Sequence, residues 1–245
     1  MIEKKKIFFK ASIVALALLF CNTGFTQTPG LGTWNVLNAE FSFTDKWKLF
    51  SELQVRSQKF YNHFSYHEIK GGVSYDINDK ASALVGMGQY VTYDPTGNFK
   101  SPVSNSEFRI WEQFTLTNNL DRLKLEHRYR AEQRFTSSGF RNRFRYRLNS
   151  IIPLNKKKVE AKTFYLTASD EVFLTDKQPY FERNRFFAGS GYAFNDLFTI
   201  QGGWLRQFDF RLNQNSITKD YLQISLLFDF KTHESKKERH PSSMD

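Results

Sequence analysis

The chain has 245 residues, of which 17% are aromatic and 24% are charged, and it carries a formal net charge of +10. This length suits one domain with a substantial core and is short for two. No apolar stretch of about 20 residues occurs, which argues against a transmembrane helix. A basic balance can indicate nucleic-acid binding, but no helix-turn-helix, zinc-finger or RNA-binding signature is present. We therefore expect no nucleic-acid partner.

Residues 1–26 have the three regions of a secretory signal peptide in their usual order. Lysines 4–6 and Lys10 form a positive start, residues 11–20 (ASIVALALLF) form an apolar stretch, and Gly24 and Thr26 are small residues before a cleavage site. A buried N-terminal strand or helix is the alternative. The single cysteine lies inside this segment, so the exported chain would hold neither a disulfide nor a thiol-based metal site.

From residue 33 to residue 230 the chain alternates apolar and polar residues without a linker, which predicts one β domain over 27–230 and a polar tail over 231–245. Turns rich in Asn and Asp, such as 44–46 and 78–80, alternate with connections that we expect to be longer, near 61–64, 94–105, 136–139, 175–180 and 212–218. Such an asymmetry is typical of outer-membrane barrels. The predicted strands are 33–43, 47–60, 65–77, 81–93, 106–118, 123–135, 140–154, 161–174, 181–194, 198–211 and 219–230.

The alternation is clearest in two neighbouring segments, 123–135 and 140–148. In the second, every other residue is an arginine, and the residues between them are mostly Phe, Tyr or Leu. A strand places these two sets on opposite faces, whereas a helix would scatter the arginines around its circumference. The first segment repeats the pattern with Lys, Glu and Arg on one face.

An apolar face turned inward would surround a lumen of about 11 strands, which is wider than the roughly 8 strands whose side chains fill a barrel. We therefore expect the apolar face to meet lipid and the polar face to line a water-holding lumen. Strands of about 12–14 residues with aromatic ends fit a tilted membrane strand and its interfaces. The fold class is an all-β, antiparallel transmembrane (outer-membrane) β-barrel of about 10–12 strands with a charged lumen. Eleven segments are visible, whereas bacterial barrels have even numbers. Either segment 33–43 is surplus to ten strands, or a twelfth strand lies in 94–105 or near the N-terminus, so the number is left open.

Three segments carry a family resemblance: Gly32-Thr33-Trp34, the run from Trp47 to Arg56 (WKLFSELQVR), and the run from Arg183 to Tyr192 (RNRFFAGSGY). With these segments, the chain resembles the family called domain of unknown function 2490 over essentially all of its exported part. The resemblance implies a Gram-negative outer-membrane barrel. It implies no activity and no catalytic residues.

The candidate functional residues are the charged side chains that we expect in the lumen. They allow two interpretations: a structural lattice of ion pairs, or an arginine-lined pore that favours small anionic solutes. We favour the lattice, and the two can coexist. Further carboxylate partners are expected at Glu52, Glu68 and Glu107. The predicted lumen charge cluster comprises Arg128, Arg130, Arg134, Arg141, Arg143, Arg145, Arg147, Arg183, Arg185, Glu126, Glu132 and Glu171.

The expected function is therefore that of an outer-membrane barrel, structural or a narrow solute channel, with outer-membrane lipid as its partner. Its oligomeric state is left open. One alternative is an outer-membrane hydrolase whose residues are scattered between strands, and another is a soluble secreted β-barrel that binds a ligand. No catalytic or metal-ligand spacing is present, so we predict no enzyme, cofactor or metal.

Two acidic residues conflict with the predicted lipid face. Glu112 shares its face with apolar residues, and a charged side chain there is unfavourable in lipid. Either the carboxyl group is neutral or paired, or a bulge turns the side chain away from the lipid. Asp170 poses the same problem next to Glu171, although adjacent strand residues point to opposite faces and cannot form one site.

Overall fold

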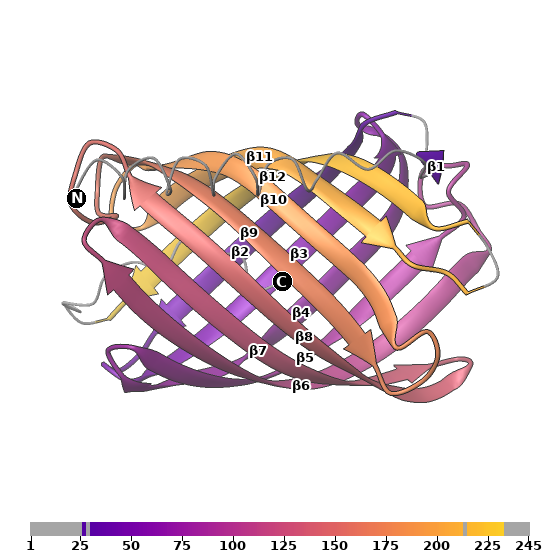
Figure 1. Ribbon diagram of the computed structural model, residues 1–245, viewed down its shortest axis with the longest axis horizontal. Coiled ribbons are helices and arrows are strands. Elements are labelled where there is room, and N and C mark those ends of the chain that lie inside the picture. Colours follow the sequence, from indigo (N-terminus) through magenta and orange to yellow (C-terminus); the bar gives the residue numbers. More distant parts are fainter. Residues whose placement is uncertain (1–25, 28–29, 213–214, 233–245) are drawn as a thin grey trace, which may run out of the picture.

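The computed structural model describes residues 26–27, 30–212 and 215–232, and this part of the chain forms one closed β-barrel with oblique strands (Figure 1). Within those residues no helix is long and apolar enough to cross a membrane. The predicted signal peptide, apart from Thr26, and the tail beyond residue 232 lie outside the described residues. The strands are β1 (Thr26–Gln27), β2 (Gly32–Ser42), β3 (Trp47–Lys59), β4 (Asn62–Asn78), β5 (Ala81–Tyr93), β6 (Val103–Leu120), β7 (Leu123–Thr136), β8 (Gly139–Pro153), β9 (Thr163–Thr175), β10 (Phe181–Ala193), β11 (Phe198–Asp209) and β12 (Ile217–Lys231).

The barrel wall consists of eleven strands, β2 to β12, and each of the eleven predicted strands is confirmed. Consecutive strands pair antiparallel, and the wall closes where β12 pairs with β2 in parallel, from Tyr221 opposite Gly32 to Lys231 opposite Ser42. The predicted barrel of about 10–12 strands is therefore confirmed, and its antiparallel pairing holds for every pair of neighbouring wall strands except the closing pair. Residues 94–102 hold no further strand, and the two-residue β1 only adds a short parallel pairing at the start of β12.

The alternating sequence determines which side chains point inward. Along β7 the residues alternate between buried and less buried positions, so that Lys124, Glu126 and Arg128 are inside and Leu125 and Tyr129 are outside. Over the described residues, 36 polar or charged side chains are buried, against 15 hydrophobic ones. An interior with this composition is the reverse of a soluble protein's core, as the sequence predicts.

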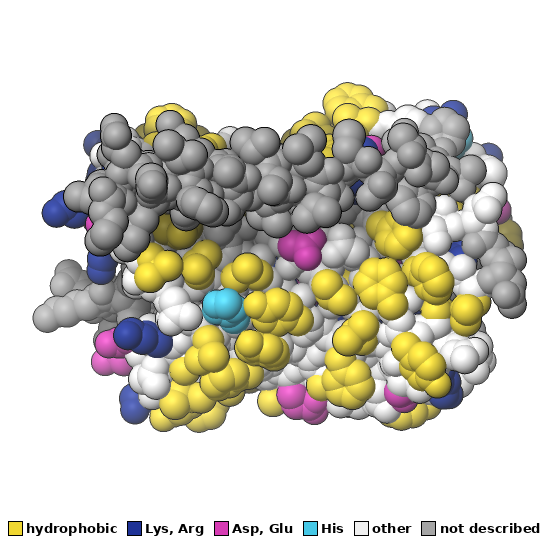
Figure 2. Space-filling model, in the orientation of Figure 1, with side chains coloured by type: hydrophobic (Ala, Val, Ile, Leu, Met, Phe, Trp, Pro, Cys, Tyr) yellow, Lys and Arg dark blue, Asp and Glu magenta, His cyan; other side chains and the backbone are white. Residues whose placement is uncertain are grey.

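The outer wall is apolar. Large hydrophobic side chains on it are 36–62% exposed, for example Ile69, Val85 and Phe144, and Figure 2 shows them spread over the visible wall, with Lys and Arg toward the two ends. Aromatic rings pack against one another near both ends of the strands, as in Phe194 with Phe198 and Phe135 with Phe140. These rows match the two aromatic belts expected at membrane interfaces.

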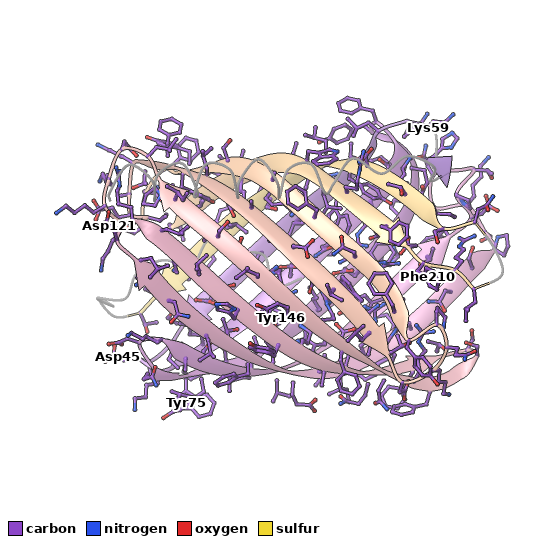
Figure 3. All side chains as sticks on the ribbon, in the orientation of Figure 1. Asp45, Lys59, Tyr75, Asp121, Tyr146 and Phe210 are labelled. Carbon is purple, nitrogen blue, oxygen red and sulfur yellow. The ribbon has the colours of Figure 1, made fainter. Side chains whose placement is uncertain are left out.

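Asp45 and Asp121 lie at one end of the barrel, and Lys59 and Phe210 at the other (Figure 3). The first end, here called the turn end, holds connections 43–46, 79–80, 121–122, 154–162 and 194–197; we call the other the loop end. The predicted longer loops near 61–64 and 136–139 are two-residue turns, and the nine-residue connection 154–162 lies at the turn end. The predicted asymmetry in loop length is therefore wrong.

Aromatic side chains fill part of the lumen, and glycines make room for them. A Cβ on Gly86 would lie 2.4 Å from the ring of Trp111, and one on Gly191 would lie 2.2 Å from the ring of Tyr165. Trp111 and Tyr165 are both 0% exposed. Since only glycine leaves this space, both rings can lie against the inner surface of a neighbouring strand.

Candidate functional site: the charge lattice of the lumen

All twelve residues of the predicted charge cluster face the lumen, from strands β7, β8, β9 and β10. Ten of them are buried, with exposures of 1–9%. Arg141 and Arg183 lie nearer the loop end, where their side chains are 31% and 21% exposed. Alternation along each strand turns them inward, and the register of β7 with β8 places Arg130 opposite Arg145 and Glu132 opposite Arg143.

Glu132 on β7 is the centre of this lattice. Its carboxylate accepts hydrogen bonds from Nε of Arg143 at 2.8 Å and from an NH group of Arg145 at 2.7 Å. Guanidinium nitrogens of Arg130 and Arg109 lie 3.6 and 3.9 Å from it. The Glu132 side chain is 0% exposed. One buried carboxylate thus neutralises charge from three neighbouring strands.

Glu171 on β9 continues the lattice toward the turn end. It accepts a hydrogen bond from Arg128 at 2.5 Å and two from Arg145, at 2.8 and 3.0 Å. Arg147 pairs with Glu126 at 3.4 Å. The contact between Arg128 and Glu171 joins β7 to β9 across the inner surface of β8, so the lattice is not confined to adjacent strands.

Glu182 was not predicted as a lumen residue. Simple alternation along β10 would place it outside when Arg183 is inside, but the pairing of β10 with β9 shifts register between Phe181 and Arg183. A β-bulge of this kind re-aims a side chain. Glu182 consequently points inward and pairs with Arg141 at 2.7 Å and Arg134 at 3.2 Å.

Arg134 also pairs with Glu107 on β6, and Glu107 in turn accepts a hydrogen bond from Arg109 at 2.7 Å. Arg183 pairs with Asp209 on β11. The loop-end ion pairs therefore involve β6, β7, β8, β10 and β11.

Aromatic rings supply further partners for the arginines. The ring of Phe173, 0% exposed, lies within 4.5–5.8 Å of the guanidinium carbons of four arginines: Arg143, Arg145, Arg183 and Arg185. The guanidinium carbons of Arg56 and Arg185 lie 3.3 and 4.7 Å from the ring of Trp34. Cation–π contacts strengthen when they are removed from water. No sequence motif marks these rings as partners, since Phe and Trp at inward positions look the same as core residues.

A second, smaller lattice lines β3 and β4, which carry Glu52 and Glu68, two of the expected carboxylate partners. Lys70 pairs with Glu52 at 2.7 Å and with Glu68 at 2.6 Å, and its side chain is 0% exposed. Arg56 also pairs with Glu68, at 3.0 Å. Glu52 and Glu68 thus have lumen partners as predicted, but these partners come from their own side of the barrel.

These side chains occupy the middle of the lumen and are buried there. Glu52, Lys70, Arg130 and Glu132 each have side chains that are 0% exposed, so water does not touch them. The expected water-holding lumen does not extend to these four side chains. An eleven-stranded wall is wide for aliphatic filling, but arginines are long, and stacked on aromatic rings they span the gap.

Glu112 and Asp170 do point outward, and their strands have no bulge at those positions. Each is paired with an amide on the next strand. Gln133 donates to Glu112 at 3.0 Å, and Asn184 donates to Asp170 at 3.0 Å. Asp170 and Glu171 face opposite sides, as predicted. The two outer carboxylates therefore have one neutral partner each, in contrast to the arginines around Glu132.

The described residues contain no group of three or more His, Cys, Asp or Glu side chains placed to hold a metal ion. The lattice itself consists of charges that neutralise one another, and such groups hold shape and exclude water. Its geometry does not form a nucleophile with an adjacent base.

A closed barrel with an apolar outer wall, aromatic belts and a charged interior is a transmembrane β-barrel of the outer-membrane type. The chain belongs to the family described as protein of unknown function (DUF2490), which matches residues 31–218. No curated protein matches it. One similar solved structure is that of LpxR from Salmonella typhimurium, at 8% identity and a TM-score of 0.49, covering 74% of this chain and 83% of that one. A likeness this distant carries no argument about activity.

Proposed function

We propose that this protein is a structural, non-conducting barrel of the outer membrane, held closed by the charge lattice of its lumen. The observation that carries the proposal is the environment of Glu132. Its carboxylate is 0% exposed and is surrounded by guanidinium groups from three strands. Such a centre joins three strands through buried charges, which supports a closed lumen at this height.

The outer wall supports the membrane location. In water, the exposed Ile69, Val85 and Phe144 would form part of an apolar surface far larger than soluble monomers display. In lipid, the same surface is favourable, and the closed hydrogen-bonding of eleven strands leaves no unpaired strand edge. The secreted soluble alternative would need a second apolar layer to cover this wall.

The pairing of the charges supports closure over conduction. A pore lined by arginines needs guanidinium groups that face water and passing anions. Here Arg130, Arg143 and Arg145 are 2–3% exposed and contact carboxylates, an amide or rings. Breaking a buried ion pair by removing one partner costs about 3–5 kcal/mol, so an open state that separates several pairs would be rarely populated.

Location and closure have separate tests. Membrane fractionation should recover the protein with the outer membrane, soluble only in detergent, and with a folded form that migrates differently on gels from the heated form.

Proteoliposomes that contain the protein should not swell in sugar solutions faster than empty liposomes. Recovery in the aqueous fraction would contradict the location, and rapid swelling would contradict closure.

A further inference from the structure

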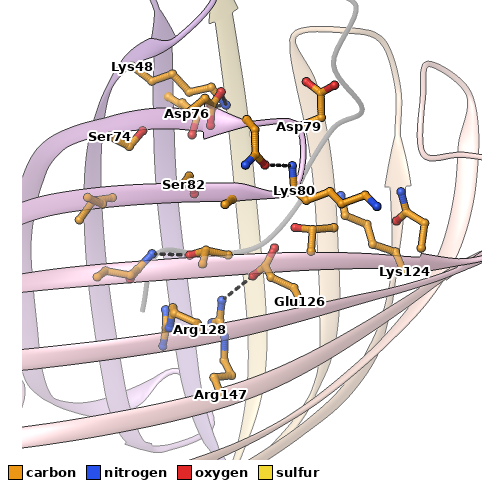
Figure 4. A pocket seen from close by; sticks show the side chains of 18 of the residues that line it. Lys48, Ser74, Asp76, Asp79, Lys80, Ser82, Lys124, Glu126, Arg128 and Arg147 are labelled. Atoms are coloured by element: carbon orange, nitrogen blue, oxygen red, sulfur yellow. Dashed lines mark hydrogen bonds and ion pairs between the residues drawn. The ribbon is translucent and has the colours of Figure 1, made fainter.

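A cavity of about 330 Å³ opens inside the turn end of the barrel, below the charge lattice (Figure 4). Strands β2 to β8 and the connection 154–162 contribute to its wall. The size falls at the lower end of the roughly 300–1,000 Å³ range of small-molecule sites. Six cations and four carboxylates line the cavity, a balance of two positive charges: Lys48, Lys80, Lys124, Arg128, Arg147 and Lys158 against Glu40, Asp76, Asp79 and Glu126.

The charges of this wall are unevenly distributed. Three of the four carboxylates are already engaged: Lys48 pairs with Glu40 at 2.9 Å and lies 3.8 Å from Asp76, and Arg147 pairs with Glu126. On the other side, Lys80 from the turn after β4 and Lys158 from connection 154–162 reach the cavity as exposed side chains. Asp79 lies beside Lys80 on that side (Figure 4), so these two lysines leave it with one positive charge in excess.

The floor of the cavity adds to this potential. Arg128 on β7 lies directly opposite Arg147 on β8, and like charges in that position destabilise a sheet, although Glu171 and Glu126 each pair with one of them. The imbalance extends through the lumen, where twelve Lys or Arg side chains and seven Asp or Glu side chains are buried among the described residues. Since arginine cannot lose its proton, an anion in the cavity would offset part of this excess.

Neutral polar groups complete the wall. Ser82, Thr115, Thr117 and Asn119 line the cavity together with Ser74, Asn78 and Gln113. Hydroxyl and amide groups both donate and accept hydrogen bonds, so they suit a ligand with several hydroxyl groups. A phosphate monoester carries a charge of about −1.5 to −2 at pH 7, which matches the balance of the lining.

From this cavity we propose that the turn end of the barrel binds a small phosphorylated polyol, with Lys80, Lys158 and the buried Lys124 around the phosphate and the hydroxyl-bearing wall around the polyol. The inference goes beyond the structural role of the barrel. It does not depend on closure either, because a conducting barrel with the same cavity would bind the same ligand.

The test is calorimetric titration of the full-length protein in detergent with glucose 6-phosphate, inorganic phosphate and glucose as probes. Glucose 6-phosphate should bind, more tightly than inorganic phosphate, and glucose should not bind measurably. The double variant Lys80→Gln/Lys158→Gln should weaken glucose 6-phosphate binding by about tenfold or more, since each of the two substitutions removes a charge-assisted contact with the phosphate. Both lysines are exposed, so this variant should fold, which heat-modifiable migration on gels verifies.

The matched control is Lys46→Gln/Lys157→Gln, which removes the same charge from the turn end without touching the cavity lining. It should change affinity by less than about twofold, the size expected of a screened surface effect. Equal weakening by both double variants, equal binding of glucose, or no binding of glucose 6-phosphate would overturn the proposal. Equal affinity for inorganic phosphate would overturn its polyol part.

Discussion

Glu132 and Glu112 carry the same charge at mid-barrel on neighbouring strands, but they point to opposite sides of the wall. Glu132 points inward and has hydrogen bonds or ion pairs to several arginines. Glu112 points outward and accepts a hydrogen bond from the neutral amide of Gln133 at 3.0 Å. Glu132 is thus surrounded by arginines, whereas Glu112 has a neutral partner, although the outer face does hold one ion pair nearer its loop end, between Arg206 and Asp220.

The comparison teaches where the stability of this barrel resides. In a soluble protein the interior is apolar and charges are outside; here the interior consists of ion pairs, stacked rings and hydrogen bonds, which depend on geometry and not on burial of apolar area. Substitution of an interior residue should therefore lower the free energy of unfolding strongly, because its buried partners lose their matched charge or ring. Substitution on the outer face should change this free energy little, because lipid packs against many side chains equally well.

The largest expected effect is that of Glu132→Gln. It leaves Arg143 and Arg145 buried with one carboxylate fewer, and we expect the free energy of unfolding to fall by about 3–5 kcal/mol. Urea titration of the protein in lipid vesicles measures it. Glu112→Gln is the matched substitution and should change this free energy by less than about 1 kcal/mol. If both substitutions lowered the free energy of unfolding equally, the inner and outer faces would not differ in how they hold a carboxylate.

Gly86→Ala should lower the free energy of unfolding by about 1–3 kcal/mol, the usual effect of overpacking. The new Cβ would lie 2.4 Å from the buried ring of Trp111. The outward Gly202 is the matched control, because a Cβ there meets only the Gln223 carbonyl oxygen, at 3.8 Å. The same urea titration applies, and a harmless Gly86→Ala would mean that the lumen at this height is loosely filled.

Phe173→Leu removes the ring shared by four arginines but keeps most of the apolar volume. We expect a loss of about 1–2 kcal/mol in the free energy of unfolding, from lost cation–π contacts. The outward Phe144, 51% exposed, serves for comparison: Phe144→Leu should cost less than about 0.5 kcal/mol. If the outer substitution proves the more harmful one, the rings at the lumen are only filling space.

The smallest expected effect has the opposite sign. Glu112→Leu replaces a carboxylate on the lipid face and should raise the free energy of unfolding by about 1 kcal/mol, below the roughly 2–4 kcal/mol that a midplane Arg or Lys costs. A clear destabilisation in vesicles would instead indicate that Glu112 has a partner in the membrane.

Alternation with period 2 was sufficient to predict every strand and the direction of each clustered charge. It could not predict Glu182, since a bulge between Phe181 and Arg183 has no signature in the residues around it. Nor could it predict closure by a parallel pair, because alternation within a strand contains no information on which strands meet last. The burial of the central lumen side chains could not be predicted for a further reason. The number of strands indicates the width of the barrel, but not how far arginines stacked on rings extend into it.

The central claim, that the lumen charges hold the barrel closed, is tested most directly by single-channel recording in planar bilayers. The wild-type protein should show no steady conductance, and Arg130→Ala/Arg145→Ala, which removes two arginines from the Glu132 centre, should introduce one. A wild-type conductance that favours anions and falls when Arg143 and Arg145 are replaced by alanine would contradict the claim and identify the lattice as the lining of a pore.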